Sequence, residues 1–403
     1  MFKVVGIPQS RKFRNDLNEN FNVTNQELQR QEKRITKLIQ DTPQPSEIVD
    51  ARGEHATVGE RLDITDEKIQ SVSKYFVDGS RVEIDLFPYR GANISSIVPG
   101  QFSSTRYDEL ITVAKNANMN SITIVCTWYM DTKTSSTIYR DSSKTIEDAE
   151  VITAIRKAKA AELKVMLKPH VDVLDGTFRG EIKPYDPVVW FDSYRAFIAN
   201  YTSIAEKENV ELFCIGTELK SMTTTTYTSQ WITTINAIRV MFNNDMTYAA
   251  NATFIAPNEE YAQIEFWSYL DYAGLDVYLK LTKTFNPAQY DVARGWTSSA
   301  EGADVLKELE KWRKTHGKPV LFTEIGCTNY NGCTQDPAKT DWKPLEINNK
   351  EQSQFVESIF QIWTSKKWLH GFFWWRLSFN KDDAFTVEER EAVLAFEKWS
   401  ELT

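Results

Sequence analysis

Two hydrophobic patterns alternate along the chain after residue 80. Short apolar runs of strand length are separated by longer stretches in which apolar residues recur every three or four positions, as on one face of a helix. The predicted strands begin at residues 91, 121, 164, 211, 246, 273, 319 and 371. The predicted helices span residues 105–117, 146–161, 187–207, 228–242, 301–316, 350–367 and 387–400.

This alternation predicts an α/β fold, a (β/α)8 TIM barrel, over residues 79–403. Eight strand-then-helix units in roughly 320 residues suit a barrel of this kind. An open doubly wound sheet is the alternative. It fits less well because the first strand runs into GANISSIVPG (91–100), which lacks the G-x-G-x-x-G phosphate loop of that fold.

Residues 1–78 have a different pattern, a seven-residue register typical of a coiled coil. It places Arg14, Phe21, Leu28 and Ile35 at one core position and Leu17, Thr24, Gln31 and Leu38 at the other. We therefore expect an N-terminal α-helical coiled coil that ends before Pro43 and joins copies of the chain. A homotrimer is favoured, although the mixed core also suits a dimer. A lone amphipathic helix packed on its own chain is the alternative.

Composition narrows the classes of function. The 47 basic and 56 acidic residues give a net charge of −9, which argues against nucleic acid as a partner. No apolar run is long enough to cross a membrane and no signal peptide is recognisable, so we expect neither membrane insertion nor Sec export. The four histidines and four cysteines lack the spacing of a metal site, so no metal or other cofactor is expected. Cys327 and Cys333 share a loop and could pair.

Two glutamates stand where predicted strands end. Glu218 ends the fourth strand, in VELFCIGTEL, and Glu324 ends the seventh, in KPVLFTEIG. Each alone could be a solvated strand end. In (β/α)8 barrels, however, the chemistry lies at the C-terminal ends of the strands. Because strands four and seven lie on roughly opposite sides of the barrel, the two acids can face each other across its mouth.

A facing pair of carboxyl groups is the machinery of glycoside hydrolysis. Groups about 5–5.5 Å apart give retention of configuration through a covalent intermediate, and groups roughly 6.5–9.5 Å apart give inversion. One acid must hold a proton and the other must stay ionised, so their surroundings should differ.

These segments resemble the clan A glycoside hydrolases, which carry the acid/base on strand four and the nucleophile on strand seven. Within the clan, IGTEL with the following Ser221, and KPVLFTEIG, are most similar to family 113, the endo-β-1,4-mannanase family. The resemblance implies that Glu218 is the acid/base and Glu324 the nucleophile. Most of the clan has Asn before the acid/base, where it binds the sugar 2-hydroxyl. This chain has Thr217, which leaves that contact unassigned, with Asn251 as the candidate substitute.

Other polar and aromatic residues near strand ends predict the wall of a sugar cleft. They are Trp128, Lys168, His170, Asp276, Tyr278, Trp374, Trp375 and Arg376. The resemblance implies that a strand-eight tryptophan floors the subsite at the reaction centre and that Tyr278 hydrogen-bonds the nucleophile. Neighbouring residues of a strand point in opposite directions, so only one of the two tryptophans can face inward. Trp128 could instead pack under a loop, and His170 could be structural.

The segment PSEIVDARGEHATVGERLD (45–63) resembles VVDARG…TLGERLD, found in N-terminal modules of tail fibre and baseplate proteins from phages of Gram-positive bacteria. The match runs in order through Asp50, Ala51, Arg52, Gly53, Gly59, Glu60, Arg61, Leu62 and Asp63. It implies a virion protein that is anchored to other tail or baseplate proteins through residues 1–78 and displays the barrel outward.

The sequence therefore predicts a phage tail-associated retaining glycoside hydrolase that binds and cleaves a host cell-surface polysaccharide. The alternative is an inactive receptor-binding or structural tail protein with a glycosidase-like barrel. Thr217 keeps this alternative open, whereas the presence of both acids argues against it. The sugar and the linkage would be set by loops 131–144, 172–186, 280–298 and 327–348.

Overall fold

The computed structural model describes residues 33, 87–256, 258–340 and 346–400. Apart from Lys33, the predicted coiled coil lies outside the described residues, and so does the segment at 45–63 that resembles phage tail proteins. The boundary predicted between residues 78 and 79 also lies outside them and stays a prediction.

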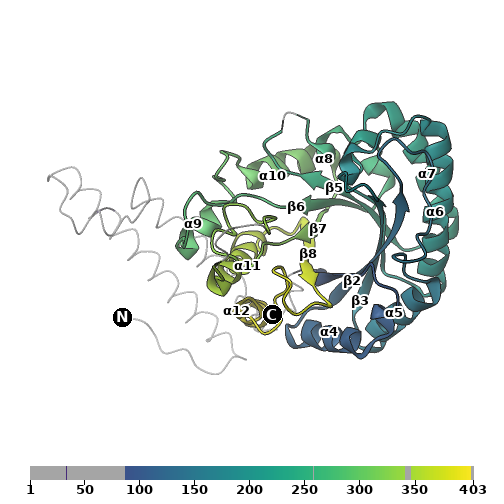
Figure 1. Ribbon diagram of the computed structural model, residues 1–403. Helices are drawn as coiled ribbons and strands as arrows, with labels where there is room; N and C mark the ends of the chain where they lie inside the picture. The colour runs from purple at the N-terminus through teal and green to yellow at the C-terminus, as the bar shows by residue number, and fades with distance from the viewer. Residues whose placement is uncertain (1–32, 34–86, 257, 341–345, 401–403) are drawn as a thin grey trace, which may run out of the picture. The chain divides into compact units, whose positions relative to one another are not determined.

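Eight parallel strands close into a barrel, in which each strand pairs with its neighbours in chain order and β8 pairs with β1 (Figure 1). The strands are β1 (Tyr89–Ser95), β2 (Ser121–Met130), β3 (Lys164–Val173), β4 (Leu212–Thr217), β5 (Asp245–Ala252), β6 (Tyr272–Val277), β7 (Val320–Ile325) and β8 (Leu369–Leu377). The prediction of a (β/α)8 barrel is confirmed, and the open doubly wound sheet is wrong.

Helices surround the strands as an outer layer (Figure 1). The seven that were predicted are α4 (Thr105–Asn116), α5 (Asp148–Ala160), α6 (Pro187–Lys207), α7 (Thr228–Met241), α10 (Val305–His316), α11 (Asn349–Trp363) and α12 (Glu391–Ser400). Within the described residues, two further helices, α8 (Glu260–Gln263) and α9 (Gln289–Arg294), are too short to show a helical period in the sequence. Short 3-10 helices are η1 (Gln101–Ser103), η2 (Arg179–Glu181), η3 (Lys220–Met222), η4 (Thr225–Tyr227) and η5 (Phe266–Tyr269). Among the described helices, none has the length and apolarity needed to cross a membrane.

Capping residues set the ends of the longer helices. The carboxylate of Asp186 accepts hydrogen bonds from the amides two and three residues later, and Pro187 occupies the first turn of α6. Asp304 caps α10 in the same way, and Gly317, at a φ of 67°, ends that helix in the left-handed region that glycine adopts most easily. The predicted limits differ most at the start of α10 and α12 and at the end of α11, each by four residues.

The barrel interior changes from apolar to polar along its length. One end is filled by a buried cluster of Tyr89, Met166, Leu212, Cys214, Ala249, Leu321 and Phe373. Toward the C-terminal ends of the strands, the inward positions are held by buried polar residues such as Asn93, Lys168 and Asp276. Because buried polar groups need partners, this half of the barrel is where a functional site is expected.

Candidate active site

Glu218 directly follows β4 and has an unusual backbone conformation. Its φ of 51° lies in the left-handed region, which is uncommon for any residue other than glycine. The pairing of β4 with β5 shifts between Cys214 and Thr217, so an irregularity precedes the turn. The amide of Glu218 donates a hydrogen bond to the carbonyl oxygen of Ala249 at 2.8 Å, which ties the turn to β5.

Glu324 lies on β7, where the strand is irregular on both sides. The register shifts between Leu275 and Asp276 in the pairing with β6, and between Phe322 and Ile325 in the pairing with β8. As a result, the consecutive residues Thr323 and Glu324 both contact groups inside the barrel, which a regular strand would not allow. Irregularities of this kind commonly re-aim side chains at functional sites.

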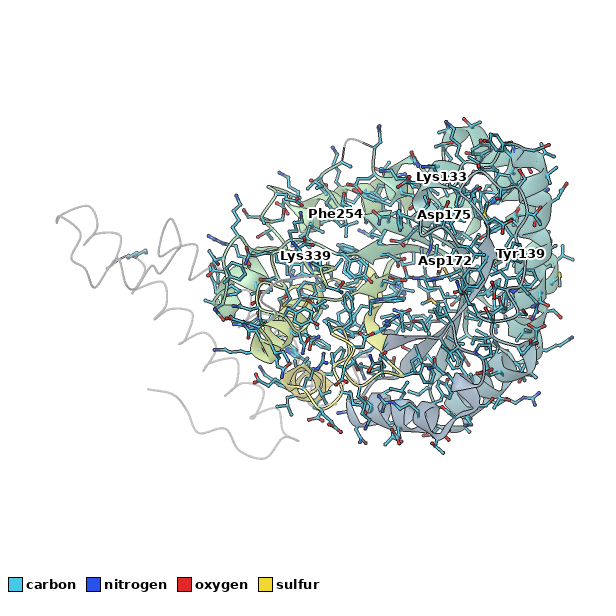
Figure 2. The ribbon with its side chains drawn as sticks, in the orientation of Figure 1. Lys133, Tyr139, Asp172, Asp175, Phe254 and Lys339 are labelled. Atoms are coloured by element: carbon cyan, nitrogen blue, oxygen red, sulfur yellow. The ribbon has the colours of Figure 1, made fainter. Side chains whose placement is uncertain are left out.

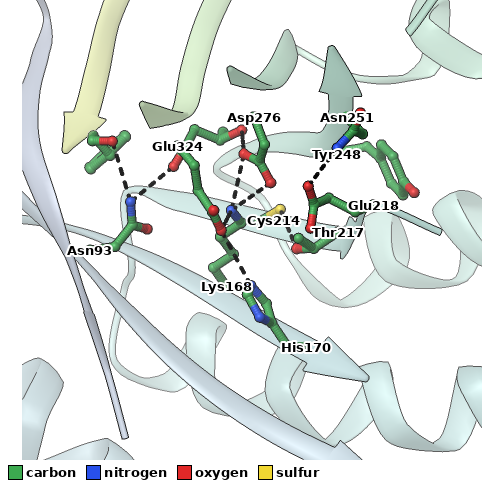
Figure 3. A network of polar contacts seen from close by, with 12 residues as sticks. Asn93, Lys168, His170, Cys214, Thr217, Glu218, Tyr248, Asn251, Asp276 and Glu324 are labelled. Atoms are coloured by element: carbon green, nitrogen blue, oxygen red, sulfur yellow. Dashed lines mark hydrogen bonds and ion pairs between the residues drawn. The ribbon is translucent and has the colours of Figure 1, made fainter. Parts of the chain in front are cut away.

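A fully buried lysine binds the carboxylate of Glu324. Lys168 Nζ lies 2.6 Å from Glu324 Oε1 and 3.1 and 3.2 Å from the two oxygens of Asp276 (Figure 3). Tyr278 Oη donates to the other oxygen of Glu324, Oε2, at 2.8 Å. Burial alone would lower the pKa of Lys168, but the charges of Asp276 and Glu324 outweigh it and raise that pKa, so the lysine stays protonated.

Asp276 shares this lysine with Glu324. Burial raises the pKa of Asp276 well above its usual value, and the charge of Glu324 adds to the effect, while Lys168 and the Thr323 hydroxyl oppose it. Thr323 Oγ1 donates to Asp276 Oδ1 at 2.7 Å. The ammonium group of Lys168 is therefore the shared ion-pair partner of two buried acids, Asp276 and Glu324.

Glu218 has different surroundings from Glu324. Its Oε1 accepts a hydrogen bond from Asn251 Nδ2 at 2.9 Å, and its Oε2 lies 3.5 Å from Arg179 Nη1. Burial, followed by the charge of Glu324, raises the pKa of Glu218, whereas Arg179 and Asn251 counteract the rise. Glu218 thus holds a proton more readily than an exposed glutamate does, while Glu324 is bound by an ammonium group and a phenol. This is the contrast that a proton donor and an ionised nucleophile require.

The two tryptophans of β8 face opposite ways. The indole of Trp374 is completely buried against Phe355 and Phe396 in the helical layer, and its N–H donates to the carbonyl oxygen of Phe385 at 2.8 Å. Trp375 is partly exposed and stacks parallel to the His170 ring, with a centroid separation of 6.5 Å. Trp375 is therefore the tryptophan at the mouth, and the prediction that Trp374 contacts substrate is corrected.

Trp128 is also placed away from the carboxyl pair. It points out of the barrel toward α6, where its indole N–H donates to Tyr201 Oη at 3.0 Å and its ring packs on Phe197. The guanidinium of Arg140 covers the ring at 4.8 Å. The prediction that Trp128 contacts sugar is therefore corrected, and its side chain packs under a loop. The neighbouring residues of β2 point into the barrel, so Trp128 points outward.

His170 and Arg376 both lie near Trp375. His170 is buried, its Nε2 is 3.9 Å from Glu324 Oε1, and that nitrogen has no hydrogen-bond partner among the described residues. Burial lowers the pKa of His170 well below its usual value, so the ring is neutral. Arg376 is held by Asp383, at 2.6 and 3.1 Å, and by Ser95 Oγ at 2.9 Å, which makes it a support of the mouth.

Sequence reasoning missed Arg179, which comes from η2 in the loop after β3. Its guanidinium binds Asp172 Oδ1 at 2.6 and 3.0 Å (Asp172 is labelled in Figure 2), as well as approaching Glu218. No periodic pattern marks a loop residue of this kind.

Asn93 was also missed, although a polar residue inside the apolar run of β1 was a usable signal. Its amide donates to the carbonyl of Thr323 at 3.1 Å.

A hollow of about 290 Å³ opens beside Arg179. Its lining includes Tyr129, Lys144, Asp172 and Phe178, from the ends of β2 and β3 and the loops after them. Arg179 links the hollow to the site, because it also contacts Glu218, whereas Glu218 and Glu324 themselves do not line the hollow. Its volume is close to the lower end of the range for small-ligand sites, which begins at about 300 Å³.

Metal-ligating side chains do not gather in the part of the chain that the structure describes. Cys126, Cys214, Cys327 and Cys333 are buried free thiols. The chemistry that the described side chains can supply is proton donation by Glu218 and attack by a carboxylate oxygen of Glu324.

Comparisons with known proteins agree with this geometry. The family model described as Glycoside Hydrolase Family 113 matches residues 95–395. A solved family 113 β-1,4-mannanase complex is 24% identical with a TM-score of 0.67, over 78% of this chain and 99% of that chain. A family 113 β-mannanase from Alicyclobacillus acidocaldarius is 22% identical with a TM-score of 0.68, over 79% and 99%. These likenesses show the fold. No curated protein sequence matches the chain.

Replacement of Lys168 by methionine should strongly destabilise the protein. Removal of the shared cation leaves Asp276 and Glu324 as buried acids without a counter-charge, which costs about 3–5 kcal/mol of unfolding free energy. Urea denaturation measures the change. Lys314→Met is the control, because Lys314 pairs with Glu310 on the surface and should change stability little. Equal effects of the two substitutions would contradict the role given to Lys168.

Proposed function

The chain belongs to glycoside hydrolase family 113, a retaining clan A family, and we propose that it cleaves a β-mannose-containing polysaccharide with Glu218 as acid/base and Glu324 as nucleophile. The observation that carries the proposal is the pair of carboxyl groups after β4 and on β7, one with a raised pKa and one bound by Lys168 and Tyr278. The similar solved structures of family 113 are β-mannanases, which supports the substrate class.

In the first step, Glu218 gives its proton to the glycosidic oxygen while a carboxylate oxygen of Glu324 attacks the anomeric carbon. The bond between that carbon and the leaving oxygen breaks, and the sugar becomes an ester of Glu324. In the second step, the ionised Glu218 takes a proton from water, and the water oxygen attacks the anomeric carbon. The ester bond breaks, Glu324 leaves as a carboxylate, and the sugar regains its original configuration.

Residues around the pair are suited to hold the sugar. Trp375 offers a partly exposed ring at the mouth, and the unpartnered Nε2 of His170 can bond a hydroxyl group. Thr217 is buried with its hydroxyl 3.9 Å from Cys214 Sγ. Asn251 is partly exposed and already bonds Glu218, so we assign it the contact with the 2-hydroxyl that Asn makes elsewhere in the clan.

We further propose that the enzyme is carried on a phage tail and acts on a host cell-surface glycan. The support is the resemblance of residues 45–63 to tail fibre and baseplate modules, together with the heptad pattern before it. In this setting, residues 1–78 would bind other tail or baseplate proteins, and the barrel would reach the host surface.

Replacement of Glu324 by glutamine should lower kcat by roughly 10⁴-fold or more, because the amide cannot form the covalent intermediate. Glycan affinity should stay within about threefold, since the side chain keeps its size. Release of reducing ends from β-1,4-mannan and host glycans measures turnover, and calorimetry with the same glycans measures binding. Glu162→Gln, an exposed glutamate between α5 and β3, is the control. Wild-type turnover in Glu324→Gln would rule out the assignment, whereas binding without turnover in the wild type would favour a receptor-binding protein.

Replacement of Arg179 by methionine should extend activity to higher pH. Unactivated substrates require protonated Glu218, so kcat/KM falls as pH rises through the pKa of Glu218. Arg179 lowers that pKa, and its removal should therefore raise the pKa and move the basic limb of the profile upward. Lys133→Met is the control, because Lys133 (labelled in Figure 2) pairs with Glu181 on the surface. A basic limb that stays in place or moves down would contradict the contact.

The tail-anchor proposal predicts that the full chain is a trimer and a virion component. Light scattering on the purified chain should give the mass of three chains. Antibodies against residues 79–403 should label the tail tip of virions in electron micrographs. A mass of one chain would contradict the coiled coil, and virions without label would contradict the location.

A further inference from the structure

A buried glutamate behind Glu218 has no part in the chemistry described above. Glu260, the first residue of α8, is 1% exposed. Its Oε1 accepts hydrogen bonds from Tyr248 Oη at 2.7 Å and from Thr223 Oγ1 at 3.1 Å. Its Oε2 accepts one from the backbone amide of Asn251 at 2.8 Å. All three partners donate to the carboxyl group and so oppose the effect of burial, which raises the pKa of Glu260 to about 8.

Two of these partners also bond to Glu218 or to the residue after it. Tyr248 Oη accepts a hydrogen bond from the amide of Leu219 at 2.7 Å. Asn251 Nδ2 donates to Glu218 Oε1 at 2.9 Å, and Tyr248, Asn251 and Glu218 lie together in Figure 3. Glu260 is thereby connected to the catalytic residue both through its backbone and through its carboxyl group.

Glu218 needs such support because of its backbone conformation. Glu218 adopts a left-handed conformation, which is unfavourable for a residue with a side chain. Conformations of this kind persist at functional sites only where the surroundings determine them. The hydrogen bond from Leu219 to Tyr248 and the one from Glu218 to Ala249 fix the two amides of this turn.

We propose that Glu260, acting through Tyr248 and Asn251, is a positioning residue that keeps the acid/base Glu218 aligned for proton transfer. The inference rests on the proposed function, because it concerns Glu218 as the acid/base. The positioning role concerns only one of the two carboxyl groups of the site. Glu324 is bound by Lys168 and Tyr278, and Glu260 bonds to neither of them among the described residues. Loss of Glu260 should therefore weaken protonation and leave nucleophilic attack in place.

Glutamine at position 260 should disturb this arrangement. If its amide oxygen still faces the backbone N–H of Asn251, its NH2 group faces the Tyr248 hydroxyl and the Thr223 hydroxyl. Tyr248 Oη already accepts the amide of Leu219, so its own hydrogen loses its acceptor. A buried donor without a partner is unfavourable, and the turn at Glu218 can relieve that cost by moving.

The test compares two leaving groups in Glu260→Gln and Tyr248→Phe. Phenyl β-mannobioside needs protonation of its leaving oxygen, whereas 2,4-dinitrophenyl β-mannobioside does not. We expect kcat/KM to fall about 10²-fold for the phenyl glycoside and less than about threefold for the dinitrophenyl glycoside. Azide should restore kcat on the dinitrophenyl glycoside, because it attacks the covalent intermediate without a base.

Glu259→Gln is the matched control. Glu259 precedes Glu260 in the chain and accepts hydrogen bonds from the amides of Thr253, Ile255 and Ala256, at 2.9 to 3.0 Å. These bonds organise the same loop but reach neither Leu219 nor Asn251. Any loss of activity in this variant should be equal for the two leaving groups, as a general loss of stability would cause.

Equal losses for both leaving groups in Glu260→Gln and Tyr248→Phe would overturn the inference. Crystal structures of the variants give a readout that does not depend on substrate. We expect the left-handed turn at Glu218 to be lost or its carboxyl group to be displaced in Glu260→Gln, and an unchanged Glu218 would also overturn the inference. Failure of the wild type to cleave either mannoside would instead count against the proposed substrate class, and the crystal structures would then decide the inference alone.

Discussion

The contact of Lys168 with Asp276 and Glu324 is the interaction on which the rest of the site depends. It joins β3, β6 and β7 inside the barrel, where the lysine has no exposure to water. Charges in such surroundings are tolerated only when they are paired and hydrogen-bonded. The lysine therefore places a positive charge against the carboxyl group of Glu324, and the polar half of the barrel is arranged around that contact.

The two candidate catalytic carboxyl groups owe their difference to the irregular strands that carry them. The break in β4 turns Glu218 out of the strand and toward Asn251 and Arg179. The shifts around β7 turn Glu324 inward, next to Lys168 and Tyr278. On regular strands, the two acids would lie at the same rim of the barrel, but Glu218 would not face Asn251 and Glu324 would not face Lys168.

The periodicity of the sequence was enough to predict the eight strands, the seven longer helices and the strand-end positions of Glu218 and Glu324. It could not tell which of Trp374 and Trp375 faces inward, because both faces of a barrel strand are buried and apolar. Arg179 and Glu260 were missed because a loop and a four-residue helix carry no period. Trp128 was misplaced for a related reason, since the sequence showed its proximity to a strand end but not its direction.

The sharing of one lysine by two acids has a consequence for the energy of the reaction. In the free enzyme, Lys168 faces two carboxyl groups, and the charge of Glu324 helps to raise the pKa of Asp276. In the glycosyl-enzyme proposed above, Glu324 is an uncharged ester, so the pKa of Asp276 falls while Lys168 still contacts its carboxyl group. Asp276 would thus replace Glu324 as the counter-ion of Lys168 while the intermediate lasts.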